Sequence, residues 1–168
     1  MKTFPRLILA SLAVLAVSAT ALAEEKNGLL VTVQKTTLDR SDQRGGYFYG
    51  DRLNRTEGLK VSIKNTSFKP MPEGEVRWEI LNRKHDSSSI ESTDGKEKLK
   101  ALKPAEIAEL KIGAAEVTGY RDGYENAKDK IEWQITVIQE GKEVMKSAST
   151  AGFDAIAKRA TKVKPPKR

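Results

Sequence analysis

Side chains that could carry out catalysis are scarce in this chain. It contains no cysteine and one histidine, His85, which lies in the polar run of residues 84–89. A general base needs an orienting partner and a nucleophile within reach, and neighbouring serines in one loop do not supply that arrangement. Without cysteine, a zinc site would rest largely on carboxylates, an unusual ligand set. The 23 acidic residues include no distinctive pair for glycoside hydrolysis. We therefore expect no catalytic residues, no cofactor and a protein that is not an enzyme.

Oxygen-bearing side chains gather in one predicted loop, at Asp122, Glu125, Asn126 and Asp129. Calcium prefers oxygen ligands, but this spacing lacks the alternating acids of an EF-hand loop. The sequence favours solvated loop charges over a metal site, so we predict no metal ligands.

Aromatic and arginine side chains form a candidate interaction surface in two predicted loops. Both residue types are frequent anchors of binding interfaces. The alternative is that the rings form an edge strand and a tyrosine corner that cover the end of the domain. The candidate residues are Arg44, Tyr47, Phe48, Tyr49, Arg52, Tyr120, Arg121 and Tyr124.

Alternation of apolar and polar residues is the main structural signal. It predicts half-buried strands at residues 29–33, 59–63, 76–80 and 131–137, because successive side chains of a strand point to opposite faces. Trp78 and Trp133 fall on the apolar faces of these strands, so we expect both in the core. Residues 139–142 have the composition of a hairpin turn that leads into a strand at 143–149.

The stretch between residues 96 and 112 leaves two interpretations open. It is rich in Ala, Glu, Lys and Leu and could be helical. Pro104 would interrupt such a helix near its centre. We therefore favour two strands, 96–102 and 105–112, with Ala108, Leu110 and Ile112 pointing inward.

Seven short strands separated by turns predict two packed antiparallel sheets. Over residues 28–150 the chain resembles the small exported immunoglobulin-like domains of bacterial envelopes. The resemblance rests on residues 59–65 (LKVSIKN), on Trp78 and on residues 102–106 (LKPAE), and the cysteine pair of antibody domains is missing. It implies an all-β, immunoglobulin-like antiparallel sandwich, followed by a short C-terminal helix and a basic tail. Because antiparallel strands alternate in direction, the long connections 39–58, 83–95 and 113–130 should emerge at one end.

The first 23 residues have the features of a cleavable signal peptide. A basic start is followed by an apolar run at residues 7–17, and small side chains stand at Ala21 and Ala23. The run is shorter than the roughly 20 residues that a membrane-spanning helix needs. We expect export to the periplasm or the extracellular space, a sandwich domain at 24–150, and a short helix with a flexible basic tail at 151–168. The lack of cysteine favours a bacterial envelope.

The positive charge of the chain lies mainly at its C-terminus. The formal net charge is +7, and residues 158–168 hold six basic side chains and no acidic one. Such a tail is typically solvated, or makes weak contact with an anionic surface. We expect no nucleic-acid partner, because no aromatic residue is interleaved with these charges, and no transmembrane segment after signal cleavage.

Together these observations predict an exported, non-enzymatic binding module of the cell envelope or extracellular space. Its partner would be a protein or an envelope polymer, and surface or pilus assembly would be a specific form of this role. The alternative is an accessory protein or inhibitor of secreted hydrolases.

Overall fold

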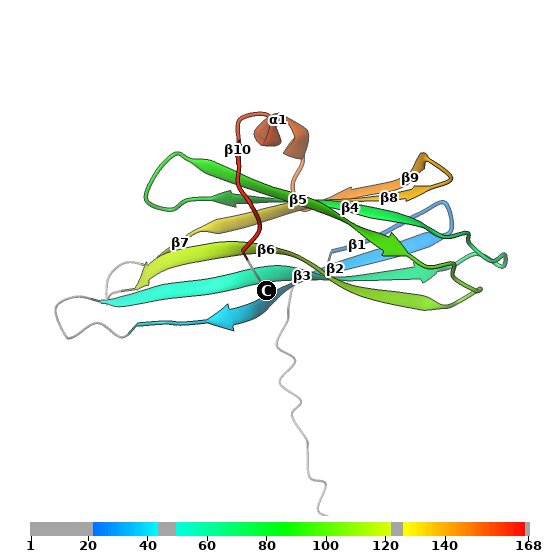
Figure 1. Ribbon diagram of the computed structural model, residues 1–168, viewed down its shortest axis with the longest axis horizontal. Helices are drawn as coiled ribbons and strands as arrows, with labels where there is room; N and C mark the ends of the chain where they lie inside the picture. Colours follow the sequence, from blue (N-terminus) through cyan, green and yellow to red (C-terminus); the bar gives the residue numbers. More distant parts are fainter. Residues whose placement is uncertain (1–21, 44–49, 122–125, 167–168) are drawn as a thin grey trace, which may run out of the picture.

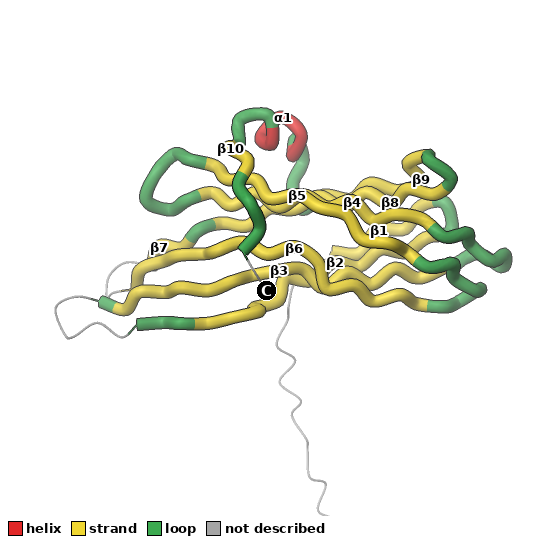
Figure 2. Tube along the Cα trace, in the orientation of Figure 1, coloured by secondary structure: helices red, strands yellow, loops and turns green. Residues whose placement is uncertain are grey.

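The computed structural model describes residues 22–43, 50–121 and 126–166. Within these residues the fold is all-β, as the sequence predicts: two five-stranded sheets lie one above the other with a single short helix (Figures 1 and 2). The first sheet has the order β1-β2-β3-β6-β7, with β1 Leu22–Lys26, β2 Leu29–Arg40, β3 Asp51–Asn65, β6 Ile107–Arg121 and β7 Asn126–Lys128.

The second sheet has the order β10-β5-β4-β8-β9. Its strands are β4 Gly74–Arg83, β5 Ile90–Leu99, β8 Lys130–Gln139, β9 Lys142–Ala148 and β10 Thr161–Lys162. Neighbouring strands of both sheets are antiparallel, except that β10 runs parallel to β5. The described part of the chain therefore holds ten strands, where the sequence predicts seven.

Alternating apolar residues build the core between the two sheets, as predicted. Val31 and Ile63 from the first sheet and Ile80 and Ile135 from the second are almost completely buried. Trp133 is buried among them, and so is Trp78. Both tryptophans are therefore core residues, which confirms the prediction.

Two tight hairpin turns have backbone that bends into the left-handed region. The residues between β8 and β9, Glu140 and Gly141, have φ values of 49° and 75°, which confirms the predicted turn. Asn27 and Gly28, between β1 and β2, have φ values of 53° and 74°. Asn-Gly is a strong sequence signal for such a turn, yet the sequence analysis began its first strand only after it.

The region around Pro104 forms strands and not a helix, which confirms the favoured interpretation, although the first strand lies earlier than predicted. β5 spans Ile90–Leu99, whereas the prediction was 96–102. Its burial does not alternate: Ser92 and Thr93 are buried side by side, and Lys96–Lys98 are exposed in a row. Its ladder with β4 nonetheless runs unbroken from Arg83–Ile90 to Gly74–Leu99.

The three long connections predicted from the sequence are much shorter in the structure. β2 continues to Arg40 and β3 begins at Asp51, while only residues 84–89 separate β4 from β5. β6 runs to Arg121, so most of the predicted 113–130 loop is strand. These segments escaped prediction because an irregularity at Gly58 and Gly113 breaks the two-residue period and because polar residues dominate them.

Asp129 is the residue at which the chain passes from one sheet to the other. β7 pairs with β6 up to Lys128, opposite Gly119, and β8 pairs with β4 from Lys130, opposite Arg83. Asp129 between them still donates its backbone N–H to the Thr118 carbonyl, at 2.9 Å. This crossing joins the sheets at the end where β6 and β4 terminate and β3 and β5 begin (Figure 1).

The C-terminal segment is held against the second sheet. Phe153, in helix α1 (Phe153–Ala157), is buried. Thr161 and Lys162 pair with Glu91 and Ser92 of β5, and the Val163 N–H donates to the Ser92 carbonyl at 2.8 Å. This pairing differs from the flexible tail expected from residue 158 onward. No helix among the described residues is long and apolar enough to cross a membrane.

Candidate functional site

Three of the eight candidate interaction residues come together at the end of the first sheet. Arg52 of β3 lies opposite Tyr120 of β6, and Asp51 lies opposite Arg121. Arg52 and Arg121 are exposed, and Tyr120 is partly buried. The other five candidates, Arg44, Tyr47, Phe48, Tyr49 and Tyr124, lie outside the described residues. The strand pairing thus brings together two predicted loops that are nearly 70 residues apart in sequence.

The positions of Tyr120 and Arg52 are fixed by backbone contacts. The Tyr120 ring lies directly against Gly50, where an added Cβ would come within 2.5 Å of the phenolic oxygen. Gly50 has a φ of +61°, a conformation that favours glycine. Arg52 and Gln43 exchange two backbone hydrogen bonds of 2.9 Å each. Both side chains therefore project from well-defined backbone.

A shallow polar trough lies beside these residues on the first sheet. Val117 is part of the core, so its neighbours Glu116 and Thr118 point to the opposite, outward face, as does Tyr120. The trough has a volume of about 300 Å³. It is lined by Asp39, Ser41, Asn54, Arg55, Thr56, Glu116, Val117 and Thr118. These residues were not predicted as a site from the sequence, because polar side chains within a strand form no recognisable motif.

Arg55 takes part in a local charge cluster at the edge of the trough. Its guanidinium bonds the Asp42 carboxylate at 3.0 and 3.3 Å, and Arg40 approaches the same carboxylate at 2.5 Å. The hydrogen bond from Arg55 lowers the pKa of Asp42 and, reciprocally, raises the pKa of Arg55. This cluster ties the end of β2 to β3.

A second charge cluster is centred on Asp129, whose side chain is fully buried. Its carboxylate accepts hydrogen bonds from the backbone N–H groups of His85 at 3.0 Å and Thr118 at 3.1 Å. It also accepts from the Thr118 hydroxyl at 3.2 Å and from Asn82 and Lys84 at 3.3 Å each. Burial opposes ionisation, but the bonds from His85 and Thr118 and the charge of Lys84 outweigh it and hold the Asp129 pKa well below its usual range.

His85, which the sequence places in a polar run without an orienting partner, belongs to this cluster. Its Nδ1 lies 2.7 Å from Asp129 Oδ1, and its side chain is 18% exposed. Because the carboxylate is ionised, Nδ1 must carry the hydrogen and donate. The hydroxyls of Ser87 and Ser89 bond each other at 2.7 Å. His85 therefore has a structural role, closing the β4–β5 turn onto Asp129.

The Asp129 carboxylate is used by these internal contacts, which argues against the calcium interpretation of its loop. Among residues 22–43, 50–121 and 126–166, no group of three or more His, Asp or Glu side chains is placed to hold a metal ion. Asp122 and Glu125 lie outside the described residues.

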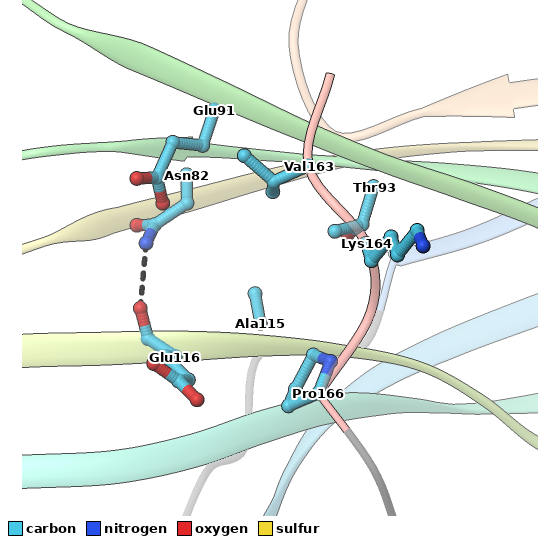
Figure 3. A pocket seen from close by; sticks show the side chains of 8 residues that line it. All are labelled: Asn82, Glu91, Thr93, Ala115, Glu116, Val163, Lys164 and Pro166. Carbon is cyan, nitrogen blue, oxygen red and sulfur yellow. Dashed lines mark hydrogen bonds between the residues drawn. The ribbon is translucent and has the colours of Figure 1, made fainter. Parts of the chain in front are cut away.

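A small cavity of about 180 Å³ lies between the sheets next to the Asp129 cluster. Figure 3 shows Asn82 and Glu91 on one side of it and the C-terminal residues Val163, Lys164 and Pro166 on the other. Asn82 donates to the Glu116 carbonyl at 2.7 Å. The C-terminal segment thus covers an opening of the sandwich.

Comparisons with known proteins add little to this description. No protein-family model and no curated protein matches the chain. One solved structure, a crystal structure of a protein from Akkermansia muciniphila, is similar at 13% identity and a TM-score of 0.34. That similarity covers 85% of this chain and 84% of the other.

Proposed function

We propose that the chain is an exported, non-enzymatic binding module of the cell envelope or extracellular space. In this proposal a protein or an envelope polymer is bound at the end of the first sheet, by Arg52, Tyr120 and Arg121 together with the polar trough. The proposal rests mainly on the β3–β6 register, which places Arg52 opposite Tyr120 beside that trough.

The physical argument is preorganisation. Aromatic and arginine side chains dominate binding energies when they are held in one place. Fixing them before binding lowers the entropy cost of association. Here paired strands, the contact of Tyr120 with Gly50 and the double bond between Arg52 and Gln43 provide that fixing.

The strand connectivity supports the immunoglobulin-like part of the proposal. β2, β3 and β6 lie in one sheet, while β5, β4, β8 and β9 lie in the other. Labelled A to G in order along the chain, these are A-B-E and D-C-F-G. The chain passes repeatedly between two sheets, as in immunoglobulin-like sandwiches, although strand D lies with A, B and E in constant-type immunoglobulin domains. Export is supported by the order of basic, apolar and small residues in the first 23 positions.

A second candidate function, inhibition of a secreted hydrolase, is favoured by the loop at the opposite end. Phe68 is 98% exposed there. The loop is held by the buried Asn65, which donates to the Lys69 carbonyl at 2.8 Å and accepts from the Ser67 hydroxyl at 2.7 Å. A rigid loop that presents an aromatic side chain suits insertion into a cleft.

Matched variants at the two ends test the proposal. The exported protein is used to capture partners from native envelope extract, with the double variant Arg52→Ser/Tyr120→Ser and, as the control, Phe68→Ser/Lys69→Ser. We expect the first variant to reduce capture at least about tenfold, in line with the loss of two interface anchors, and the second to leave it unchanged. Urea midpoints show whether each variant remains folded, and Arg52→Glu, which reverses one charge and leaves Tyr120 in place, serves as a single substitution at the same end. Loss of capture in the Phe68 variant alone would transfer the function to the opposite loop.

A further inference from the structure

A third cavity lies at an open side of the sandwich, between β2 and β8. It has a volume of about 330 Å³. Its apolar wall consists of Val33, Ile131 and Trp133, and Lys35 and Lys130 also line it. We call this cavity the β2–β8 groove.

The side chain of Leu22 also lines this groove and is 49% exposed. Leu22 begins β1 and is opposite Val33 of β2, so the two side chains share a face. Ala23 is opposite Thr32 in the same ladder. The structure therefore shows an extended segment with a leucine at the exposed rim of the groove.

Leu22 and Ala23 precede the predicted cleavage site. If processing occurs after Ala23, β1 keeps only Glu24, Glu25 and Lys26, which pair with Val31, Leu30 and Leu29. Thr32 and Val33 then lose their neighbours on that side. Among the described residues, the unpaired edge of β2 would then begin at Thr32 and not at Gln34. This edge lies next to the apolar wall of the groove. An uncovered strand edge accepts an added strand through main-chain hydrogen bonds.

The charges of the groove indicate which segment it would accept. Lys35 follows Val33 on the same face of β2 and donates to the Ile131 carbonyl at 2.6 Å. Burial lowers the Lys35 pKa, although the charges of Glu57 and Glu132 oppose this shift. Glu132 also lines the groove but pairs with Arg83 and Lys130. Lys35 forms no salt bridge within the described residues, so an acidic residue opposite it would supply one. In an added antiparallel strand, the residue two positions before the leucine would lie opposite Lys35.

We propose that the processed protein binds an extended segment of a partner protein along β2, with a large aliphatic residue in the place of Leu22 and an acidic residue two positions before it. This inference rests on the export and cleavage in the proposed function, but not on the surface formed by Arg52 and Tyr120. Main-chain pairing supplies the affinity, and the groove selects the two side chains.

The test uses protein purified after export and three peptides capped at both ends. The first is Ser-Ala-Thr-Ala-Leu-Ala, which repeats residues 18–23. The second replaces its Thr by Glu, and the third replaces its Leu by Ser. Binding is followed by NMR shifts of backbone amides. We expect saturable shifts at Thr32, Val33 and Trp133 with the first peptide, binding roughly fivefold tighter with the Glu peptide, and none with the Ser peptide.

Two variants separate groove binding from a general effect. Thr150→Trp, at a residue that lines the groove, should block binding of the first peptide and of the Glu peptide while its spectrum remains that of a folded protein. Lys35→Gln should remove the advantage of the Glu peptide without abolishing binding of the first. The intact mass of the exported protein tests cleavage separately. A mass that retains Leu22 would overturn the proposed processing, whereas a chain that starts at Glu24 and shows no localised shifts would overturn the groove.

Discussion

Replacement of Asp129 should destabilise the protein more than replacement of any exposed acid. Its buried carboxylate accepts six hydrogen bonds, two from backbone N–H groups and four from side chains. It also stands where the chain crosses between the sheets. Asp129→Ala would remove the acceptor and leave these donors in place.

The expected magnitude follows from the donors left without a partner. Leaving a buried donor unsatisfied costs about 1–3 kcal/mol, and removing one member of a buried ion pair costs about 3–5 kcal/mol. Since these contributions overlap at one carboxylate, we expect Asp129→Ala to lower the free energy of unfolding by about 3–5 kcal/mol. Asp129→Asn should cost about 2–3 kcal/mol, because the amide still accepts through one oxygen while its NH₂ faces other donors.

The loss of stability on replacing Asp129 should depend on pH, because its carboxylate titrates. The folded-state pKa of Asp129 lies below its ordinary value of 3.8. The stabilisation is therefore complete above that value and declines as the pH falls below about 4. We expect the difference in unfolding free energy between wild type and Asp129→Asn to be constant from pH 5 to 8 and to shrink towards pH 2.

Urea unfolding across this pH range measures both effects. Asp154→Asn is the matched control, because Asp154 pairs with Lys146 at 2.9 Å but is 66% exposed; its replacement should change stability by less than about 1 kcal/mol. An Asp129→Asn variant within 1 kcal/mol of wild type at pH 7, or a difference that does not change below pH 4, would refute the assignment of a buried, ionised carboxylate.

Two further substitutions and one deletion test the packing. Trp133→Ala should lower the free energy of unfolding by about 3–5 kcal/mol, the usual cost of deleting a buried aromatic ring, as read from urea midpoints; a shift below 1 kcal/mol would place the ring outside the core. Gly95→Ala should cost roughly 1–3 kcal/mol, because the new Cβ would collide with the Trp78 indole, and calorimetry that finds no loss would contradict that packing. Deletion of residues 161–168 should cost about 1–3 kcal/mol through the lost bonds to β5; unchanged stability would favour a tail that is free in solution.

The regular strands were predictable because each has one buried face. Residues 131–137 alternate along β8, and the turn after it carries the expected glycine at Gly141. β5 was misplaced because its buried positions include the polar residues Ser92 and Thr93 and its exposed residues Lys96–Lys98 are consecutive, so its sequence does not alternate. The pairing of Leu22 with Val33 was missed for another reason. Residues up to Ala23 fit a signal peptide, and no strand was sought before the Asn27-Gly28 turn.

The candidate site was predictable only in part, since its geometry depends on contacts between distant residues. The alternation of strand directions predicted that Arg52 and Tyr120 lie at one end of the domain. That they lie directly opposite each other follows from the β3–β6 register, which the sequence does not show. No local sequence pattern indicates that Asp129 accepts a hydrogen bond from His85, which lies 44 residues earlier. A carboxylate in a polar stretch has the same local sequence signal whether it is solvated or buried.

This distinction changes how the charged residues at that end are interpreted. Asp129, His85 and Lys84 hold the sheets together, and Asp42 and Arg55 hold β2 to β3. Ligand contacts at Asp129, His85 or Lys84 would compete with bonds on which the fold depends, so substitution there would alter stability before it altered binding. Arg52 and Arg121 instead lie exposed at the ends of strands whose backbone is already paired. A binding surface can therefore vary at Arg52 and Arg121 while the Asp129 cluster keeps the same fold.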